Sequence, residues 1–215
     1  MAIEVKICGV NSPAALGAAV AGGADYLGFN FYPPSPRYVT PKAAREIAAA
    51  APESLTKVGV VVDLDDVALA AILERAPLDM LQLHGRESPA RVAAIRAHFG
   101  LPVMKAVKIA GADDVAAAAA YCAVAERLLF DAKPPKDMAG ALPGGNALAL
   151  DWQLLAGTAW PIPWMLSGGL DADNVAEALR VSGARAVDVS SGVEDRPGVK
   201  NPDKIRAFLT AAKRC

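Results

Sequence analysis

The chain has 215 residues, 53% of them hydrophobic, and a formal net charge of −1 at pH 7. This length is sufficient for one domain with a core that needs no disulfide or metal, so we expect a single domain over residues 1–215. The near-zero charge, without any block of lysine or arginine, gives no electrostatic basis for binding nucleic acid or an anionic membrane.

The three cysteines, Cys8, Cys122 and Cys215, are widely separated and odd in number. A disulfide framework needs more cysteines, and a zinc site needs local clusters, so we expect reduced thiols and a cytoplasmic protein. The first residues lack the basic segment and apolar run of a signal peptide. The charge-free stretch Trp152–Leu170 contains two prolines and two adjacent glycines, which favours a loop and a buried strand over a membrane span.

Short apolar runs alternate with alanine-rich amphipathic segments along the chain. Runs that are apolar at nearly every position are typical of strands buried on both faces. They predict strands over Val5–Cys8, Tyr26–Phe31, Lys57–Val62, Met80–Leu83, Val103–Val107, Leu128–Phe130, Trp164–Leu166 and Ala186–Val189. The segments between them predict helices over Pro13–Ala21, Pro41–Ala50, Asp65–Glu74, Pro89–His98, Asp113–Ala125, a short stretch after Asp151, Ala172–Val181 and Pro202–Lys213.

Four of these helices begin with a capping residue followed by proline, namely Ser12-Pro13, Thr40-Pro41, Ser88-Pro89 and Asn201-Pro202. About eight strand–helix units without a break in composition predict a (β/α)₈ TIM barrel. The competing topology is a doubly wound open sheet. Its glycine-rich fingerprint is missing after the first strand, where residues 8–12 contain one glycine.

In a parallel barrel the functional side chains gather at the carboxyl ends of the strands. Cys8 ends the first predicted strand and Asp131 follows the sixth. A thiol and a carboxyl that face one mouth can act as a base and an acid for moving protons. The alternatives are that Cys8 only packs, as free cysteines commonly do, and that Asp131 is satisfied by Lys133 or by backbone. The other strand ends are Asn30, Asp63, His84, Val107, Ser167 and Asp188.

Two glycine turns follow the last two strands, Ser167-Gly168-Gly169 and Ser190-Ser191-Gly192. Glycine lets the backbone approach an anion closely, and free N–H groups supply the donors. Phosphate sites in such barrels are frequently formed by these two loops. Either turn alone could be a simple turn, but the pair predicts a phosphate site.

Arg37 and His84 are further candidates for binding a substrate. Arg37 ends a loop stiffened by three prolines and could pair with a carboxylate or phosphate, or else only cap its own loop at the surface. His84 could line the pocket or shuttle a proton. The one other histidine, His98, falls within a helical pattern, so we expect no multi-histidine metal site.

Taken together, these segments resemble the phosphoribosylanthranilate isomerase family of tryptophan biosynthesis, and the resemblance covers the whole chain. The motifs that carry it are Lys6-Ile7-Cys8-Gly9, Gly28 to Pro33, Ser35 to Val39, Val58 to Val62, Leu81 to Gly85, Lys105 to Val107, Leu166 to Leu170, Asn174-Val175 and Ala186 to Glu194. The last of these is the most specific.

The resemblance implies an Amadori rearrangement that converts N-(5-phosphoribosyl)anthranilate to 1-(2-carboxyphenylamino)-1-deoxyribulose 5-phosphate. It implies Cys8 as the general base and Asp131 as the general acid, with no metal and no organic cofactor. A single chain suffices for such a small barrel, so we expect a monomer. The implied binding residues are Arg37 for the carboxylate, His84 lining the pocket, Asp188 on the sugar side, and Gly168, Gly169, Ser191 and Gly192 for the phosphate.

One segment departs from the family pattern. Family members often have Gly-Gly-x-Gly before Phe-Asp-Trp, whereas this chain has Pro143-Gly144-Gly145-Asn146-Ala147 before Leu150-Asp151-Trp152. The loop follows the acid-bearing strand, so we expect it to cover the substrate.

Three alternative functions remain open on the sequence. A metal-dependent ribulose-phosphate epimerase needs more histidine ligands than this chain has. A related aminoaldose-phosphate isomerase usually works with paired aspartates, whereas the first strand here presents Cys8. A non-catalytic sugar-phosphate-binding barrel would have no reason to retain both Cys8 and Asp131.

Overall fold

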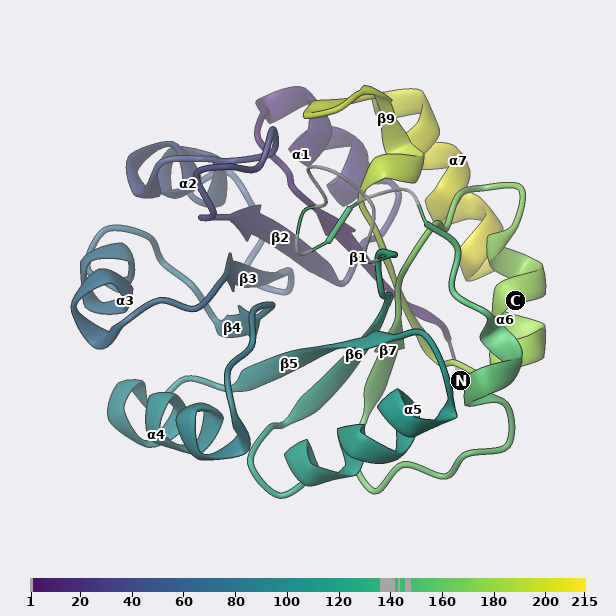
Figure 1. Cartoon of the computed structure of the whole chain (residues 1–215). Coiled ribbons are helices and arrows are strands. Elements are labelled where there is room, and N and C mark those ends of the chain that lie inside the picture. Colours follow the sequence, from purple (N-terminus) through teal and green to yellow (C-terminus); the bar gives the residue numbers. More distant parts are fainter. Residues whose placement is uncertain (1, 136–141, 143, 146–147) are drawn as a thin grey trace.

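The computed structural model describes residues 2–135, 142, 144–145 and 148–215. Eight parallel strands pair in chain order, and β8 pairs with β1 to close a barrel (Figure 1). The predicted TIM-barrel fold is therefore confirmed. The barrel strands are β1 (Glu4–Cys8), β2 (Tyr26–Asn30), β3 (Thr56–Val61), β4 (Met80–Leu83), β5 (Val103–Ile109), β6 (Arg127–Ala132), β7 (Trp164–Leu166) and β8 (Ala186–Val189).

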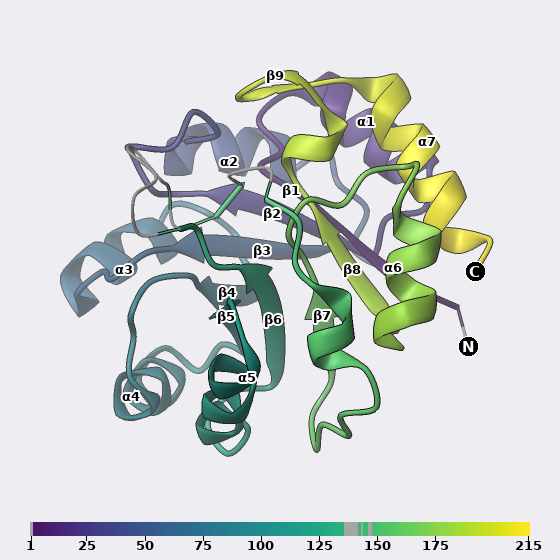
Figure 2. The same ribbon diagram turned by 45° about the vertical axis from the view of Figure 1, so that its right-hand side comes forward.

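Helices surround the barrel in both ribbon views (Figures 1 and 2). They are α1 (Pro13–Ala21), α2 (Pro41–Ala48), α3 (Asp66–Leu73), α4 (Pro89–Phe99), α5 (Ala112–Ala118), α6 (Val175–Ser182) and α7 (Pro202–Lys213), with 3₁₀ turns η1 (Ala119–Tyr121), η2 (Trp152–Leu155) and η3 (Ser191–Val193). The four predicted caps are confirmed, because Ser12, Thr40, Ser88 and Asn201 each accept a backbone N–H from the first turn. Among the described residues, no helix combines the length and apolar character that crossing a bilayer requires.

Helices α2, α3, α5 and α6 are shorter than expected, and α5 and α6 have a local physical reason. The alanine-rich segment after Asp113 leaves α-helical geometry at Ala118 and continues as η1, where the Tyr121 hydroxyl donates to the carbonyl oxygen of Glu87 at 3.0 Å. Alanine side chains bury too little surface to extend a helix by themselves. Helix α6 begins only at Val175, because the Asp171 carboxylate accepts two backbone N–H groups of the preceding turn.

The sequence did not predict a small antiparallel hairpin, which pairs β9 (Glu194–Arg196) with β10 (Val199–Lys200). Strands of two and three residues are too short to produce a recognisable periodicity. The hairpin lies at the rim of the barrel near helices α1 and α7 (Figures 1 and 2). Its turn rests against the loop after β2, since a Cβ at Gly198 would lie 2.2 Å from the Pro36 carbonyl oxygen.

The period-two alternation of strands determines which side chains line the barrel interior. Residues such as Val5 and Ile7 point outward into the large core under the helices. The inward set begins with an apolar layer formed by Met104, Ala106, Leu129, Met165 and Ala186. Two positions further along the strands from Leu129 and Ala186 stand Asp131 and Asp188, so the interior becomes polar toward the carboxyl ends of the strands.

Candidate active site

A single open pocket at the carboxyl ends of the strands collects most of the predicted site residues. It encloses about 740 Å³, a space that includes solvent at its opening. Its lining includes Cys8, Arg37, His84, Asp131, Gly168, Gly169, Asp188 and Ser191. Gly192 is not part of the lining and packs behind it, where a Cβ would lie 2.0 Å from the Leu170 carbonyl oxygen. The strand-end residues Asp63 and Val107 are also outside the lining.

Cys8 is buried at the end of β1, with Gly28 of β2 as its cross-strand neighbour. A Cβ at Gly28 would lie 2.9 Å from the Cys8 Sγ and 3.1 Å from the Lys6 Nζ. The missing side chain of Gly28 therefore makes room for both the thiol and the ammonium. Burial raises the pKa of the Cys8 thiol, and the charge of Lys6 opposes that shift without cancelling it.

Lys6 is a site residue that the sequence did not predict. Its side chain is fully buried, and its Nζ donates to the Asp188 Oδ1 at 2.7 Å across the β1–β8 register. The other oxygen of Asp188 accepts from the Ser167 hydroxyl at 3.0 Å. Burial by itself lowers the pKa of Lys6, but the Asp188 carboxylate, with a smaller contribution from Cys8, outweighs it and raises that pKa. The available signal was a lysine inside an apolar strand, two residues before Cys8.

Asp131 and His84 are adjacent across the pocket. The His84 Nε2 lies 3.2 Å from the Asp131 Oδ2, and the His84 Nδ1 lies 2.7 Å from the Nε2 of the fully buried Gln82. A ring protonated on Nε2 satisfies both contacts, donating to the carboxylate and accepting from the amide. Lys133 pairs with Asp114 and not with Asp131. The alternative that Lys133 satisfies the Asp131 carboxylate is therefore wrong. The Asp131 Oδ1 does accept a backbone N–H, from Ala132 at 2.9 Å.

Arg37 is buried, with 4% of its surface exposed, and does not lie at the molecular surface. Its aliphatic stem lies over Gly9, where a Cβ would meet the Arg37 Cβ and Cδ at 3.1 Å. Gly9 also has φ +75°, a left-handed conformation that glycine adopts without strain. The guanidinium donates from Nε and Nη2 to the two oxygens of Glu194, both at 2.8 Å.

The two predicted phosphate turns lie side by side in the pocket wall. Gly168 and Gly169 both have left-handed backbones, with φ +91° and +67°. Within the described part of the chain, the backbone N–H groups of Gly169 and Ser191 have no acceptor. Free N–H groups on a glycine turn are suited to binding an anion. The described residues contain no group of three His, Cys, Asp or Glu side chains able to hold a metal ion.

The described residues of the segment after β6 lie over the pocket. A Cβ at Gly144 would lie 2.7 Å from the His84 Nε2 and 2.9 Å from the Asp131 Oδ2. A Cβ at Gly145 would lie 2.4 Å from the Arg37 Nη1. Both glycines thus approach predicted site residues more closely than a larger residue could. Ala147, which stands where the family pattern has its third glycine, lies outside the described residues. Leu150, which replaces the phenylalanine of the pattern, is buried.

Comparison with known proteins identifies the family. Residues 5–211 match the family model described as N-(5'-phosphoribosyl)anthranilate (PRA) isomerase. The chain is 58% identical over 213 residues to the N-(5'-phosphoribosyl)anthranilate isomerase of Paramagnetospirillum magneticum, covering 99% of this chain and 98% of that protein.

Two solved structures have the same fold over nearly the full length. One is a phosphoribosyl anthranilate isomerase in complex with reduced 1-(o-carboxyphenylamino)-1-deoxyribulose 5-phosphate, with 33% identity and a TM-score of 0.83. The other is a structure of monomers generated from the dimeric phosphoribosylanthranilate isomerase of Thermotoga maritima, with 34% identity and a TM-score of 0.83. Both alignments cover 99% of this chain and 100% of the other. With the barrel, the pocket and these matches in agreement, the chain belongs to the N-(5'-phosphoribosyl)anthranilate isomerase family.

Proposed function

We propose that this chain isomerises N-(5-phosphoribosyl)anthranilate to 1-(2-carboxyphenylamino)-1-deoxyribulose 5-phosphate in tryptophan biosynthesis. The observation that carries the proposal is the convergence of Cys8 and Asp131 on one pocket that also holds Arg37 and the two glycine turns. This arrangement supplies an acid, a base, a cation for the carboxylate and backbone donors for the phosphate. The solved relative with the reduced product bound supports the same class of ligand.

In the first step, Asp131 acts as the general acid and delivers a proton to the ribose ring oxygen. The bond from that oxygen to C1 breaks, and the lone pair of the anthranilate nitrogen forms the C1 iminium. The contact between His84 and the Asp131 Oδ2 supports this role, because an N–H at Nε2 stabilises the carboxylate left behind. Gly144 over the same oxygen keeps the proton-transfer site narrow.

In the second step, the Cys8 thiolate removes the proton from C2. The C–H electron pair forms the C1–C2 double bond of an enolamine, and the C=N π pair returns to the anthranilate nitrogen. The enol hydroxyl then loses its proton while C1 gains one, which yields the ketone. All the electron pairs stay within the substrate, so the rearrangement consumes no oxidant or reductant. The Lys6 ammonium beside Cys8 favours the thiolate, and so does the positive charge of the iminium.

The remaining site residues hold the two ends of the substrate. Arg37 faces the anthranilate carboxylate, and the turns at Gly168, Gly169 and Ser191 face the phosphate, with Gly192 shaping the turn from behind. Asp188, already bonded to Lys6 and Ser167, lies on the sugar side. In this arrangement Asp188 also aligns Lys6 under the thiol.

The function is tested by turnover of freshly generated phosphoribosyl-anthranilate, followed by loss of its fluorescence in buffer with a metal chelator and no added cofactor. Rapid conversion is the expected result. Folded protein that binds the reduced product but converts no substrate would instead favour a non-catalytic sugar-phosphate-binding barrel. Faster turnover of another aminoaldose phosphate would favour the related isomerase.

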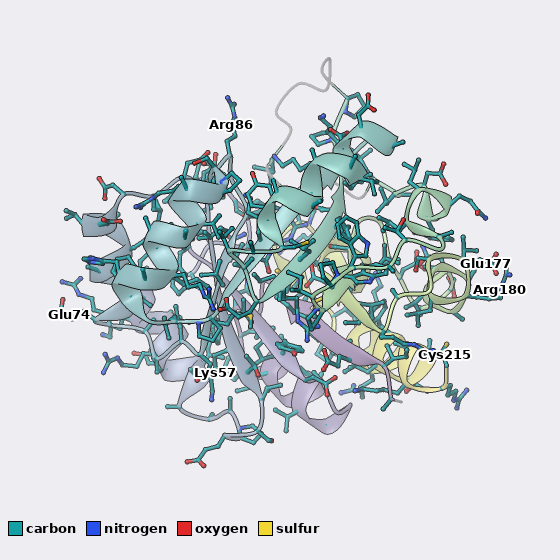
Figure 3. All side chains as sticks on the ribbon, turned by 90° about the horizontal axis from the view of Figure 1, so that it is seen from below. Lys57, Glu74, Arg86, Glu177, Arg180 and Cys215 are labelled. Carbon is teal, nitrogen blue, oxygen red and sulfur yellow. The ribbon has the colours of Figure 1, made fainter. Side chains whose placement is uncertain are left out.

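Substitution of Arg37 by alanine should act mainly on binding. Charge-assisted hydrogen bonds contribute about 1.5–3 kcal/mol, so we expect KM to rise roughly 10- to 100-fold while kcat changes little. Steady-state kinetics measure both constants. Arg180→Ala is the matched control, because Arg180 is an exposed arginine on α6 that also pairs with a glutamate (Figure 3). Unchanged kinetics in Arg37→Ala would remove Arg37 from the carboxylate site.

We further propose that the chain acts as a monomer. Among the described residues, the exposed large hydrophobic side chains are Val20, Tyr38, Val67 and Val199, which lie on separate elements and loops. Stable homodimer interfaces bury a large area and are more hydrophobic than the rest of the surface. Light scattering that gives twice the mass of one chain would contradict this proposal, and the dimeric Thermotoga maritima enzyme makes the measurement necessary.

A further inference from the structure

Arg37 belongs to a buried network of three charges at the rim of the pocket. The two carboxylate oxygens of Glu194, on β9, accept hydrogen bonds from Nε and Nη2 of Arg37, each at 2.8 Å. The Lys200 Nζ, on β10, lies 2.8 Å from the Oε1 of the same carboxylate. All three side chains are at least nine-tenths buried, so their mutual attraction is weakly screened.

The orientation of the guanidinium follows from this network. A bidentate pair through Nε and Nη2 fixes the orientation of the planar guanidinium group. It leaves Nη1 without an acceptor among the described residues, and Nη1 points toward the Gly145 segment over the pocket. Among the described residues, the edge of Arg37 without an acceptor is therefore the edge directed toward the pocket.

Lys200 has a separate connection to the phosphate end of the pocket. Its Nζ donates to the carbonyl oxygen of Ser190 at 2.7 Å, in the turn after β8. Burial by itself raises the pKa of Glu194, but Arg37 and Lys200 outweigh it and hold that pKa below its usual range. Glu194 is consequently ionised. Burial lowers the pKa of Lys200, and the Glu194 carboxylate opposes that shift without cancelling it.

The hairpin that carries Glu194 and Lys200 is itself firmly anchored. The Asn11 side chain donates to the Gly198 carbonyl at 2.8 Å, and the Lys204 Nζ donates to the Glu194 carbonyl at 2.7 Å. The Gly198 turn lies against Pro36, the residue before Arg37. The position of the guanidinium is thus determined by the hairpin as well as by its own loop.

We propose that Glu194 and Lys200 are positioning residues for the substrate carboxylate: Glu194 holds the Arg37 fork with its free edge in the pocket, and Lys200 balances the Glu194 charge and links this end to the phosphate turn. The inference rests on the proposed function. It extends that function to two residues beyond the pocket lining, which act through Arg37 and not by touching the substrate.

The test compares two stable ligands that differ only in the carboxylate. They are reduced 1-(2-carboxyphenylamino)-1-deoxyribulose 5-phosphate and the corresponding phenylamino compound without the carboxylate. The ratio of their dissociation constants, measured by calorimetry, defines the carboxylate preference. A charge-assisted pair predicts a preference of roughly 10- to 100-fold in the unsubstituted protein.

Glu194→Gln should lose most of this preference and raise KM, while kcat and the affinity for the ligand without the carboxylate change little. Glu194→Asp keeps the charge but is one methylene shorter, so it should restore part of the preference. Glu177→Gln is the matched control, since Glu177 pairs with Arg180 on the exposed face of α6 (Figure 3) and should leave the preference unchanged.

Three outcomes separate the proposals. Equal weakening of both ligands in Glu194→Gln would mean a general structural role and would overturn the positioning role. A preference lost in Arg37→Ala but retained in Glu194→Gln would overturn it as well, and would leave the role of Arg37 intact. A preference retained in Arg37→Ala would instead refute the carboxylate contact in the proposed function.

Folding of each variant is checked by circular dichroism before binding is measured. Glu194→Gln leaves two buried cations without a counter-ion, which can prevent folding. In that case Glu194→Gln combined with Lys200→Met removes one positive and one negative charge and tests the same orientation of Arg37. A full carboxylate preference in the folded double variant would overturn the proposal.

Discussion

Replacing Cys8 by alanine should lower kcat by roughly 10²- to 10⁴-fold, the usual contribution of a positioned general base. Alanine cannot accept the C2 proton, and the small change in volume leaves the pocket walls in place. Binding of the reduced product should change little, because the contacts proposed for the carboxylate and phosphate are elsewhere in the pocket. Turnover of phosphoribosyl-anthranilate and calorimetry with the reduced product measure the two effects separately.

Two controls make the Cys8 result specific. Cys215→Ala removes the exposed cysteine near the C-terminus (Figure 3), and Cys122→Ala removes the half-buried one, and both variants should retain full activity. Near-normal turnover of Cys8→Ala would mean that another group is the base.

The pH dependence of activity should report the same thiol. Burial raises the pKa of Cys8, so the thiol is protonated at neutral pH in the free protein. Because the base is the thiolate, kcat/KM should increase as pH rises from neutral toward that raised pKa. The charged groups that act on the thiol are Lys6 and Lys200, which favour the thiolate, and Asp188, which opposes it. A kcat/KM that does not change over this range would contradict a thiolate base.

Asp131→Asn should also cost roughly 10²- to 10⁴-fold in kcat, because an amide cannot give a proton to the ring oxygen. Asparagine has nearly the same shape, so the contact of this position with His84 and the affinity for the reduced product should largely persist. Single-turnover kinetics at saturating substrate separate the loss of chemistry from any loss of binding.

Asp114→Asn is the matched control for Asp131. Asp114 is a half-buried aspartate that pairs with Lys133, two residues after Asp131, so it probes the same segment from outside the pocket. A loss of activity in Asp131→Asn that appears only in KM would assign Asp131 to binding instead of acid catalysis.

Much of the site could be predicted because strand ends are visible in a sequence. Cys8, His84, Asp131 and Asp188 each occur where an apolar run stops, and the barrel topology brings such ends to one mouth. The glycine turns carry their own local signal. These predictions needed no knowledge of distances, since parallel strands in a closed barrel all point in the same direction.

The partners of these residues could not be predicted in the same way. Lys6 meets Asp188 across a separation of 182 residues, and Arg37 meets Glu194 across 157. No local pattern links positions so far apart. The contact of Gln82 with His84 could not be predicted either. Gln82 lies inside an apolar strand, and its role depends on whether its side chain points into the barrel or out of it.

The amino-acid sequence by itself determined the barrel, the order of its strands and helices, and most of the residues that reach its mouth. Periodicity, capping residues and glycine turns act over a few neighbouring positions, so they can be recognised in short stretches of sequence. Only the tertiary structure decided which charges meet in the interior: Lys6 with Asp188 under the thiol, and Glu194 with Arg37 and Lys200 at the rim. Closing the barrel and folding the hairpin over its rim bury these groups together. An unpaired buried charge is strongly destabilising, so each of these charges is paired with an opposite one.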